Sequence, residues 1–146
     1  MTSQVTTEER SRLIQAARNA AETAYAPYSK FRVGAAALGE QMIHIGSNVE
    51  NSSYTVGLCA ERAALSAAVA QRDGEIRALA VACIDALDSS GINELLPCGA
   101  CRQWFVELAP DAEIIIVGND NTKSFTVEEL MPLPFRLEKK VSENQN

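Results

Sequence analysis

Three stretches of the chain carry apolar residues at the three-to-four-residue spacing of an amphipathic helix. They span residues 7–25, 59–72 and 99–109. Thr6, followed three residues later by Glu9, forms a capping-box signature before the first stretch, which ends ahead of Pro27. A second such pair, Thr126 and Glu129, predicts a short helix near the end of the chain. We therefore expect three main helices and one short one.

Short apolar runs alternate with these helices. They cover residues 31–38, 42–47, 78–84 and 114–117, with a turn at 119–121. The first two runs meet at Gly39, which predicts an antiparallel hairpin. The last two have the continuous apolar character of buried strands and are separated by a helix, which predicts a parallel pair with a right-handed crossover. The pattern indicates an α/β fold whose mixed sheet has a hairpin on one side, parallel strands on the other, and helices on both faces.

The composition is that of an ordinary globular protein. The chain has 146 residues, of which 47% are apolar and 22% charged. No repeat or linker divides it, so we expect a single domain over residues 1–146, with a polar tail at 138–146 that frays. A chain of this length buries about 70% of its unfolded surface, so it needs no structural metal merely to fold.

The charge balance argues against a nucleic-acid partner. Thirteen Lys and Arg face 19 Asp and Glu, a formal net charge of −6, and no basic run is present. The longest apolar stretch, residues 78–84, is too short to span a bilayer, and residues 1–10 are polar, unlike a signal peptide. We therefore expect a cytoplasmic protein with no membrane partner.

Three of the four cysteines have the spacing of metal ligands. Cys98 and Cys101 lie three residues apart at the start of a predicted helix, and Cys59 opens another. If the two helix starts converge, three thiolates can bind zinc and leave its fourth position to water. Helix N-termini would offset their negative charge, and Glu61 is the candidate carboxylate for moving the protons of that water.

Two arginines and one histidine flank these positions. Arg62 and Arg102 each follow a candidate site residue directly, so we expect both to donate hydrogen bonds to the thiolates. His44, the only histidine, lies between Ile43 and Ile45 in a predicted strand, and we expect it on the surface rather than on a metal.

The cysteine pattern alone leaves two alternatives open. Cys98 and Cys101 could form a redox dithiol, because helix N-termini lower thiol pKa values. Cys83 could instead close a structural four-cysteine site. It lies inside an apolar run, however, where a small buried thiol packs well, which favours a core role for Cys83 and an open three-cysteine site.

Beyond spacing, several segments resemble one known family. Cys59-Ala60-Glu61 and Pro97-Cys98-Gly99-Ala100-Cys101 are similar to the signature of the zinc-dependent cytidine deaminases. Residues 26–36, Asn48-Val49-Glu50-Asn51 and residues 130–135 resemble further segments of that family. The chain length and the all-cysteine ligand set resemble its small homotetrameric branch.

The resemblance implies a fold, a cofactor and a reaction. It implies a three-layer α/β/α sandwich with a mixed five-stranded sheet, and one Zn²⁺ per subunit on Cys59, Cys98 and Cys101. The implied reaction is hydrolysis of cytidine and 2′-deoxycytidine to uridine and 2′-deoxyuridine with release of ammonia, in pyrimidine salvage. Glu61 would carry the protons.

The resemblance also implies residues that bind the nucleoside. Phe31 would pack against the base, Ala60 would also bind the substrate, and Asn48 and Glu50 would hold the ribose 3′-hydroxyl. From periodicity alone, Phe31 is equally a core aromatic, and Asn48 with Glu50 a polar turn. Tyr54 and Phe135 would reach the site of a neighbouring subunit. Two other functions stay open: deamination of another aminopyrimidine such as blasticidin S, and a zinc-stabilised binding module without catalysis.

Overall fold

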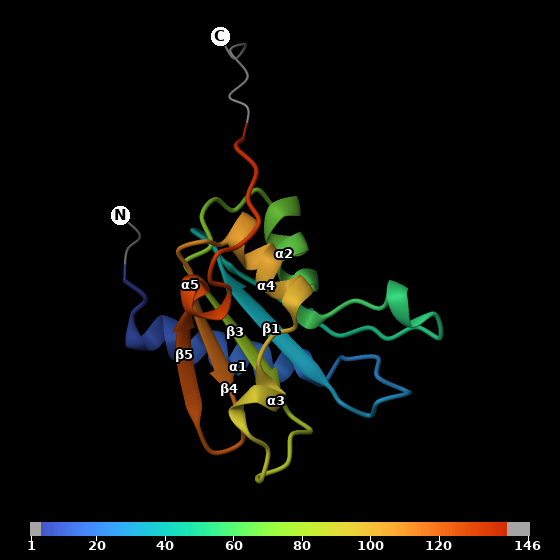
Figure 1. Ribbon diagram of the computed structural model, residues 1–146. Coiled ribbons are helices and arrows are strands. Elements are labelled where there is room, and N and C mark those ends of the chain that lie inside the picture. The colour runs from blue at the N-terminus through green and yellow to red at the C-terminus, as the bar shows by residue number, and fades with distance from the viewer. Residues whose placement is uncertain (1–3, 140–146) are drawn as a thin grey trace.

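A computed structural model describes residues 4–139 and contains one five-stranded sheet in the order β2-β1-β3-β4-β5 (Figure 1). The strands are β1 (Val33–Leu38), β2 (Ile43–Ser47), β3 (Ala78–Cys83), β4 (Glu113–Val117) and β5 (Thr122–Thr126). β3 and β4 pair in parallel and the other neighbours are antiparallel. The expected mixed α/β sheet and its hairpin are confirmed.

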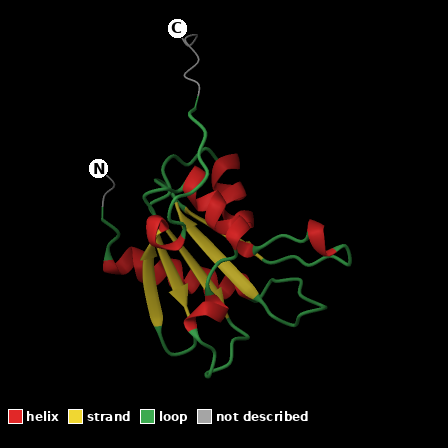
Figure 2. Ribbon diagram, in the orientation of Figure 1, coloured by secondary structure: helices red, strands yellow, loops and turns green. Residues whose placement is uncertain are grey.

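Helices lie on both faces of this sheet (Figure 2). They are α1 (Thr7–Ala21), α2 (Ala60–Ala70), α3 (Ile92–Leu95), α4 (Gly99–Leu108) and α5 (Val127–Leu130), with a 3₁₀ turn η1 (Tyr54–Val56) before α2. Within residues 4–139, no helix has the length and apolar character needed to cross a membrane. Both predicted capping boxes are present, at Thr6 and at Thr126.

Alternate residues of the central strands feed two separate cores, because successive side chains of a strand point to opposite faces. On one face, Leu13 and Ala17 of α1 pack against a set that includes Ala36 and Ala80. On the other face, α2 and α4 pack over a second set that includes Ala35 and Val81. The three layers thus follow from the continuous apolar runs of β1, β3 and β4.

Two glycines let the helices approach the sheet closely. A Cβ at Gly34 in β1 would overlap the backbone of α1 at Ala17 and Ala21. A Cβ at Gly46 in β2 would lie 2.6 Å from the carbonyl oxygen of Ala60 at the start of α2. Gly46 therefore fixes how closely the first turn of α2 approaches β2.

The first helix is shorter than its apolar pattern predicts. α1 ends at Ala21, whereas the pattern extends to residue 25. Beyond it, the Tyr25 amide donates to the Asn48 carbonyl at 2.9 Å, and Tyr25 forms a β-bridge with Val49. These contacts with the segment after β2 draw residues 22–25 out of the helix, so the expected boundary was wrong.

Two elements have no counterpart among the runs found in the sequence. β5 is mostly polar and exposed, with only Phe125 half-buried, as befits an edge strand. It follows β4 through a turn closed by the Gly118 amide on the Asn121 carbonyl, so the sheet ends in an antiparallel strand and only β3 and β4 are parallel. α3 is a single turn after Gly91.

His44 is buried, contrary to the expected surface position. Its side chain is 4% exposed, and Nε2 lies 2.7 Å from Oδ2 of Asp73. Asp73 also accepts hydrogen bonds from the amides of Gln41 and Met42, in the turn between β1 and β2. The histidine is therefore a structural partner of a buried carboxylate, brought to it by the packing of α2 on the hairpin.

Candidate active site

Three cysteine sulfurs converge where two helices begin. Cys59 is the N-cap of α2, Cys98 is the N-cap of α4, and Cys101 lies in the first turn of α4. Sγ of Cys98 lies 3.9 Å from Sγ of Cys59 and 3.7 Å from Sγ of Cys101, and all three sulfurs lie within 4.8 Å of one another. Zinc–sulfur bonds of about 2.3 Å in a tetrahedron place sulfurs about 3.8 Å apart, so this donor set fits Zn²⁺.

The surroundings favour ionisation of the Cys59 thiol. Nη2 of Arg62 lies 3.6 Å from Sγ of Cys59, one turn along α2. Hydrogen bonding from Cys101, with further contributions from Arg62 and Cys98, lowers the pKa of Cys59 to about 5. Zinc binds the thiolate form, so these contacts favour metal binding at neutral pH.

Arg102 does not make the expected contact with the thiolates. Its Nε donates to the Pro97 carbonyl at 2.8 Å, and its Nη1 donates to the Leu130 carbonyl at 2.8 Å. Leu130 ends α5, so Arg102 ties the loop before Cys98 to the C-terminal helix. Arg102 therefore holds the loop before Cys98, and the prediction that it donates hydrogen bonds to the thiolates was wrong.

Glu61 is a buried carboxylate beside the three sulfurs. Glu61 is 5% exposed, and burial raises the pKa of its carboxyl group to about 7. A carboxyl group with a pKa near neutrality can both accept and release a proton during a reaction. Position and ionisation thus suit Glu61 to proton transfer at this centre.

A cavity of about 180 Å³ opens onto Glu61. Its walls include Phe31, Asn48, Cys59, Ala60 and Cys98. Phe31 and Ala60, which the sequence predicts to bind the substrate, therefore line the same cavity as Cys59 and Cys98. Cys83 also lines it, with a residue exposure of 5% and a pKa raised to about 12 by burial, which keeps this thiol neutral.

A second cavity, of about 380 Å³, shares Asn48 and Cys59 with the first. Glu50, Tyr54 and Arg62 line it. The two cavities together provide a smaller space at the sulfurs and a larger one beside it that is lined by Glu50 and Arg62. Such a pair suits a small molecule with a flat ring and a hydroxyl-bearing arm.

Glu50 and Asn48 are both partly engaged by the backbone. One carboxylate oxygen of Glu50 accepts the amides of Tyr28 and Ser29 at 3.0 and 3.1 Å. Hydrogen bonds from Ser29, with further ones from the backbone, lower the pKa of Glu50 and keep it ionised. The Asn48 amide joins the Phe31 carbonyl to the Val33 amide, at 2.9 and 2.8 Å.

The two aromatic residues expected at a neighbouring subunit's site are both exposed. Tyr54 is 79% exposed on η1 and packs edge-to-face on Tyr28. Phe135 is 71% exposed, and its carbonyl accepts a hydrogen bond from Gln103 on α4. Sequence reasoning missed Arg32 and Asp85, which lie beside Phe31; the only signal was an Arg next to a predicted wall residue.

A three-cysteine metal centre with one buried carboxylate, at the helix starts of an α/β sandwich, has the open zinc position and the proton carrier that zinc-dependent hydrolases use. Residues 7–118 match the cytidine and deoxycytidylate deaminase zinc-binding region, and the chain belongs to that family. It is a zinc-dependent hydrolytic deaminase.

Individual relatives agree with this assignment. A cytidine deaminase of Halalkalibacterium halodurans is 41% identical over 133 residues, which cover 89% of this chain and 96% of the relative. The crystal structure of cytidine deaminase from Burkholderia pseudomallei is 39% identical, with a TM-score of 0.77 over 86% of this chain and 98% of that chain. A blasticidin-S deaminase of Bacillus cereus is 36% identical over 112 residues, 73% of this chain and 79% of that relative.

Proposed function

We propose that this protein hydrolyses cytidine and 2′-deoxycytidine to uridine and 2′-deoxyuridine, releasing ammonia. The observation that carries the proposal is the buried Glu61 facing a cavity shared with Cys59 and Cys98. That cavity continues into the space beside Glu50, where a sugar hydroxyl would find a carboxylate acceptor. The names of the relatives at 39–41% identity support the same substrate.

Zinc held by Cys59, Cys98 and Cys101 would make water acidic enough to supply a hydroxide nucleophile for C4 of the pyrimidine at neutral pH. Glu61 takes a proton from that water and passes it to N3 of the ring. The same carboxylate then carries a proton from the new C4 hydroxyl to the departing amino group. Both transfers suit a carboxyl group whose pKa is near 7.

The remaining wall residues orient the nucleoside. Phe31 offers an aromatic face to the base, and Ala60 leaves room for the ring beside the start of α2. The oxygen of Glu50 that does not bind Tyr28 and Ser29 accepts from the ribose 3′-hydroxyl, which both nucleosides carry. The second N–H of Asn48 donates to the same hydroxyl.

We also propose that residues 1–146 act as one cytoplasmic domain in pyrimidine salvage, assembled as a homotetramer and acting on free nucleosides rather than polynucleotides. The net charge of −6 supports the free nucleoside. Exposed aromatics at Tyr54 and Phe135 support contact between copies, since large exposed apolar groups mark interfaces. Light scattering after gel filtration tests the assembly, and a monomer would refute it.

The reaction is tested by the loss of cytidine absorbance when purified zinc-loaded protein is added. We expect turnover of both nucleosides and a fall in kcat of at least about 10²-fold in Glu61→Gln, which keeps the shape but cannot shuttle protons. Glu107→Gln, the same change on the exposed face of α4, is the control and should keep full activity. Absence of turnover, full activity in Glu61→Gln, or a preference for cytosine, the nucleotide or blasticidin S would overturn the proposal.

A further inference from the structure

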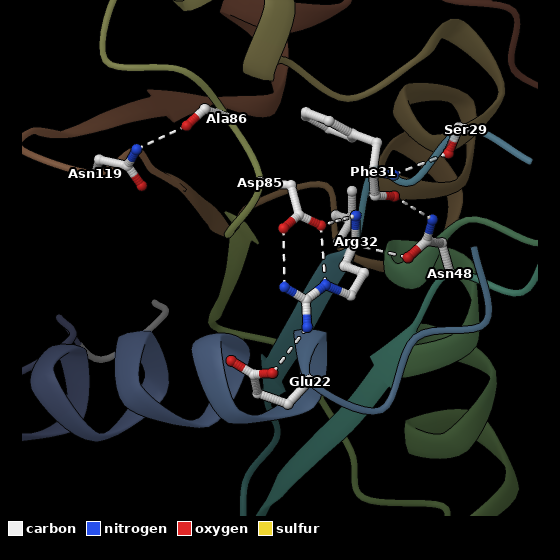
Figure 3. Close-up of polar contacts among 9 residues, drawn as sticks. Glu22, Ser29, Phe31, Arg32, Asn48, Asp85, Ala86 and Asn119 are labelled. Atoms are coloured by element: carbon white, nitrogen blue, oxygen red, sulfur yellow. Dashed lines mark hydrogen bonds and ion pairs between the residues drawn. The ribbon is translucent and has the colours of Figure 1, made fainter. Parts of the chain in front are cut away.

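Asp85, which lies two residues after the end of β3, accepts three hydrogen bonds from Arg32. Oδ2 accepts the backbone amide of Arg32 at 2.8 Å and its Nε at 2.9 Å, and Oδ1 accepts Nη2 at 2.8 Å. Figure 3 shows this paired arrangement, with Glu22 reaching only the remaining nitrogen, Nη1, at 2.9 Å. Asp85 therefore fixes both the backbone and the side chain of Arg32, whereas Glu22 contacts the side chain alone.

The loop that carries Asp85 is itself anchored. Nδ2 of Asn119, just past β4, donates to the Ala86 carbonyl at 2.7 Å (Figure 3). The same nitrogen donates to Oδ1 of Asp88 at 3.1 Å. The carboxyl ends of the two parallel strands are thereby tied together. Because its loop is anchored in this way, Asp85 can hold Arg32 in a defined position.

Arg32 is the chain neighbour of Phe31, the aromatic wall of the catalytic cavity. The backbone of Phe31 is bonded on its other sides, because its carbonyl accepts Nδ2 of Asn48 and its amide donates to Oγ of Ser29 (Figure 3). Asn48 and Ser29 thus bind the backbone of Phe31, and Asp85 binds the backbone of the next residue, Arg32. Removal of Asp85 would leave the Arg32 amide without this acceptor and would leave the Arg32 guanidinium paired with the more exposed Glu22 alone, while the Arg32 carbonyl still accepts the Ile84 amide.

We propose that Asp85 is a positioning residue that sets the placement of Phe31 against the substrate base, acting through Arg32. The kinetic effect of this role rests on the proposed cytidine deaminase function. Asp85 touches neither the cavity nor the sulfurs, so its loss should weaken ground-state binding of the base more than the proton transfers at Glu61. The expected signature is a change in KM with little change in kcat.

The kinetic test compares Asp85→Ala with Phe31→Ala and the double variant. An aromatic contact of this kind is worth roughly a 2- to 10-fold change in binding, so we expect Asp85→Ala to raise KM for cytidine about 5-fold and to change kcat less than about 2-fold. The double variant should match Phe31→Ala, because Asp85 acts only through Phe31. Additive effects in the double variant, or an unchanged KM in Asp85→Ala, would overturn the proposal.

Glu113→Ala is the matched control. Glu113 binds Arg10 through both carboxylate oxygens, and its side chain is 26% exposed, against 25% for Asp85. It lies at the start of β4, the end of the strand farther from Asn119. Loss of this ion pair should leave KM unchanged, and an equal rise in KM would refute a specific role for Asp85. Asp85→Asn, which keeps an acceptor for the Arg32 amide, should show an intermediate KM.

A second readout does not depend on turnover. The chain has four phenylalanines, so labelling with 4-fluorophenylalanine gives four ¹⁹F resonances, and Phe31→Leu identifies that of Phe31. We expect the Phe31 resonance to shift or broaden in Asp85→Ala and to stay in place in Glu113→Ala. An unmoved Phe31 resonance refutes the link between the two residues. If the wild-type protein does not turn over cytidine, the proposed function fails, while the ¹⁹F comparison still decides whether Asp85 positions Phe31.

Discussion

His44 and Asp73 meet at 2.7 Å inside the protein, although 29 residues separate them in the chain. The same carboxylate accepts the amides of Gln41 and Met42, and the Asp73 carbonyl accepts the amide of Glu40. Asp73, three residues after the end of α2, thus binds the hairpin turn of β1 and β2, a turn that lacks the usual Asp-Gly pair.

Removal of this carboxylate should destabilise the fold without touching the reaction. Asp73→Ala leaves a buried histidine and two amides without their acceptor, so we expect the melting temperature to fall by about 5–10 °C. Asp111→Ala, an exposed aspartate, is the control and should change it little. The kcat of folded protein at 25 °C should be unchanged, because the pair lies at the end of the sheet opposite the sulfurs. A normal melting temperature for Asp73→Ala would contradict this account.

The same pair predicts how stability depends on pH. Burial by itself would raise the pKa of Asp73, but hydrogen bonds from His44, Gln41 and Met42 outweigh it and lower that pKa below its ordinary value of 3.8. The stabilisation is therefore complete above pH 3.8 and is lost as the pH falls through the lower native pKa. Urea unfolding between pH 7 and pH 3 should show a steeper acid loss for the wild type than for Asp73→Asn. Parallel curves would show that another group is responsible.

Arg62 should tune metal retention. Its guanidinium contacts the Cys59 sulfur, while its Nε is buried and makes no hydrogen bond among residues 4–139. Loss of such a contact to a metal ligand typically weakens binding 10- to 100-fold. We expect zinc transfer from Arg62→Ala to a chromogenic chelator to be at least about 10-fold faster than from the wild type. Arg18→Ala, on the exposed side of α1, should release zinc at the wild-type rate.

Zinc content should separate a catalytic centre from a closed structural site. Cys59→Ser, Cys98→Ser and Cys101→Ser should each bind less than one zinc per chain, since each removes one of three ligands. Cys83→Ser should keep one zinc per chain and lose only stability, because its thiol is buried in the core outside the sulfur cluster. Loss of zinc from Cys83→Ser would favour a four-cysteine binding module.

Gly46 should be intolerant of even one methyl group. A Cβ there would lie 2.5 Å from the Ala64 amide nitrogen and 2.6 Å from the Ala60 carbonyl oxygen. Gly46→Ala must displace α2, at a cost of about 3 kcal/mol in the free energy of unfolding, and should lower kcat because Glu61 moves with the helix. Gly91→Ala meets nothing within 4 Å and serves as the control. Equal stability of the two variants would refute the close approach.

Local sequence patterns predicted the sulfur centre well, because each ligand lies at a helix start that its own neighbours specify. Cys98 and Cys101 follow Pro97, and Cys59 precedes an alanine-rich helix. The geometry confirms that the three sulfurs converge. Cys83, in a uniformly apolar strand, is buried as its surroundings predicted.

The errors concern partners far away in the chain. Arg102 was expected to bind sulfur because it follows Cys101, but the Leu130 carbonyl lies within its reach in the fold. His44 alternates with isoleucines as a surface residue would, yet Asp73 provides a buried partner 29 residues later. β5 was not predicted because an exposed edge strand needs little apolar character. Its backbone hydrogen bonds to β4, which the sequence pattern does not reveal, hold it in the sheet.

Three consecutive buried alanines, Ala35 to Ala37, occupy the centre of β1 between α1 on one face and α2 on the other. Small side chains on both faces make the sandwich thin at this strand, and the Glu61 end of α2 is held at that spacing. Accumulated substitutions in this protein should therefore be tolerated unevenly. Changes on β5 or on the outer side of α1 add bulk toward water, whereas a larger side chain at Ala35 or Ala37 would push against α2, the helix that carries Glu61. Directed evolution toward new substrates should therefore vary the cavity walls and leave these two alanines unchanged.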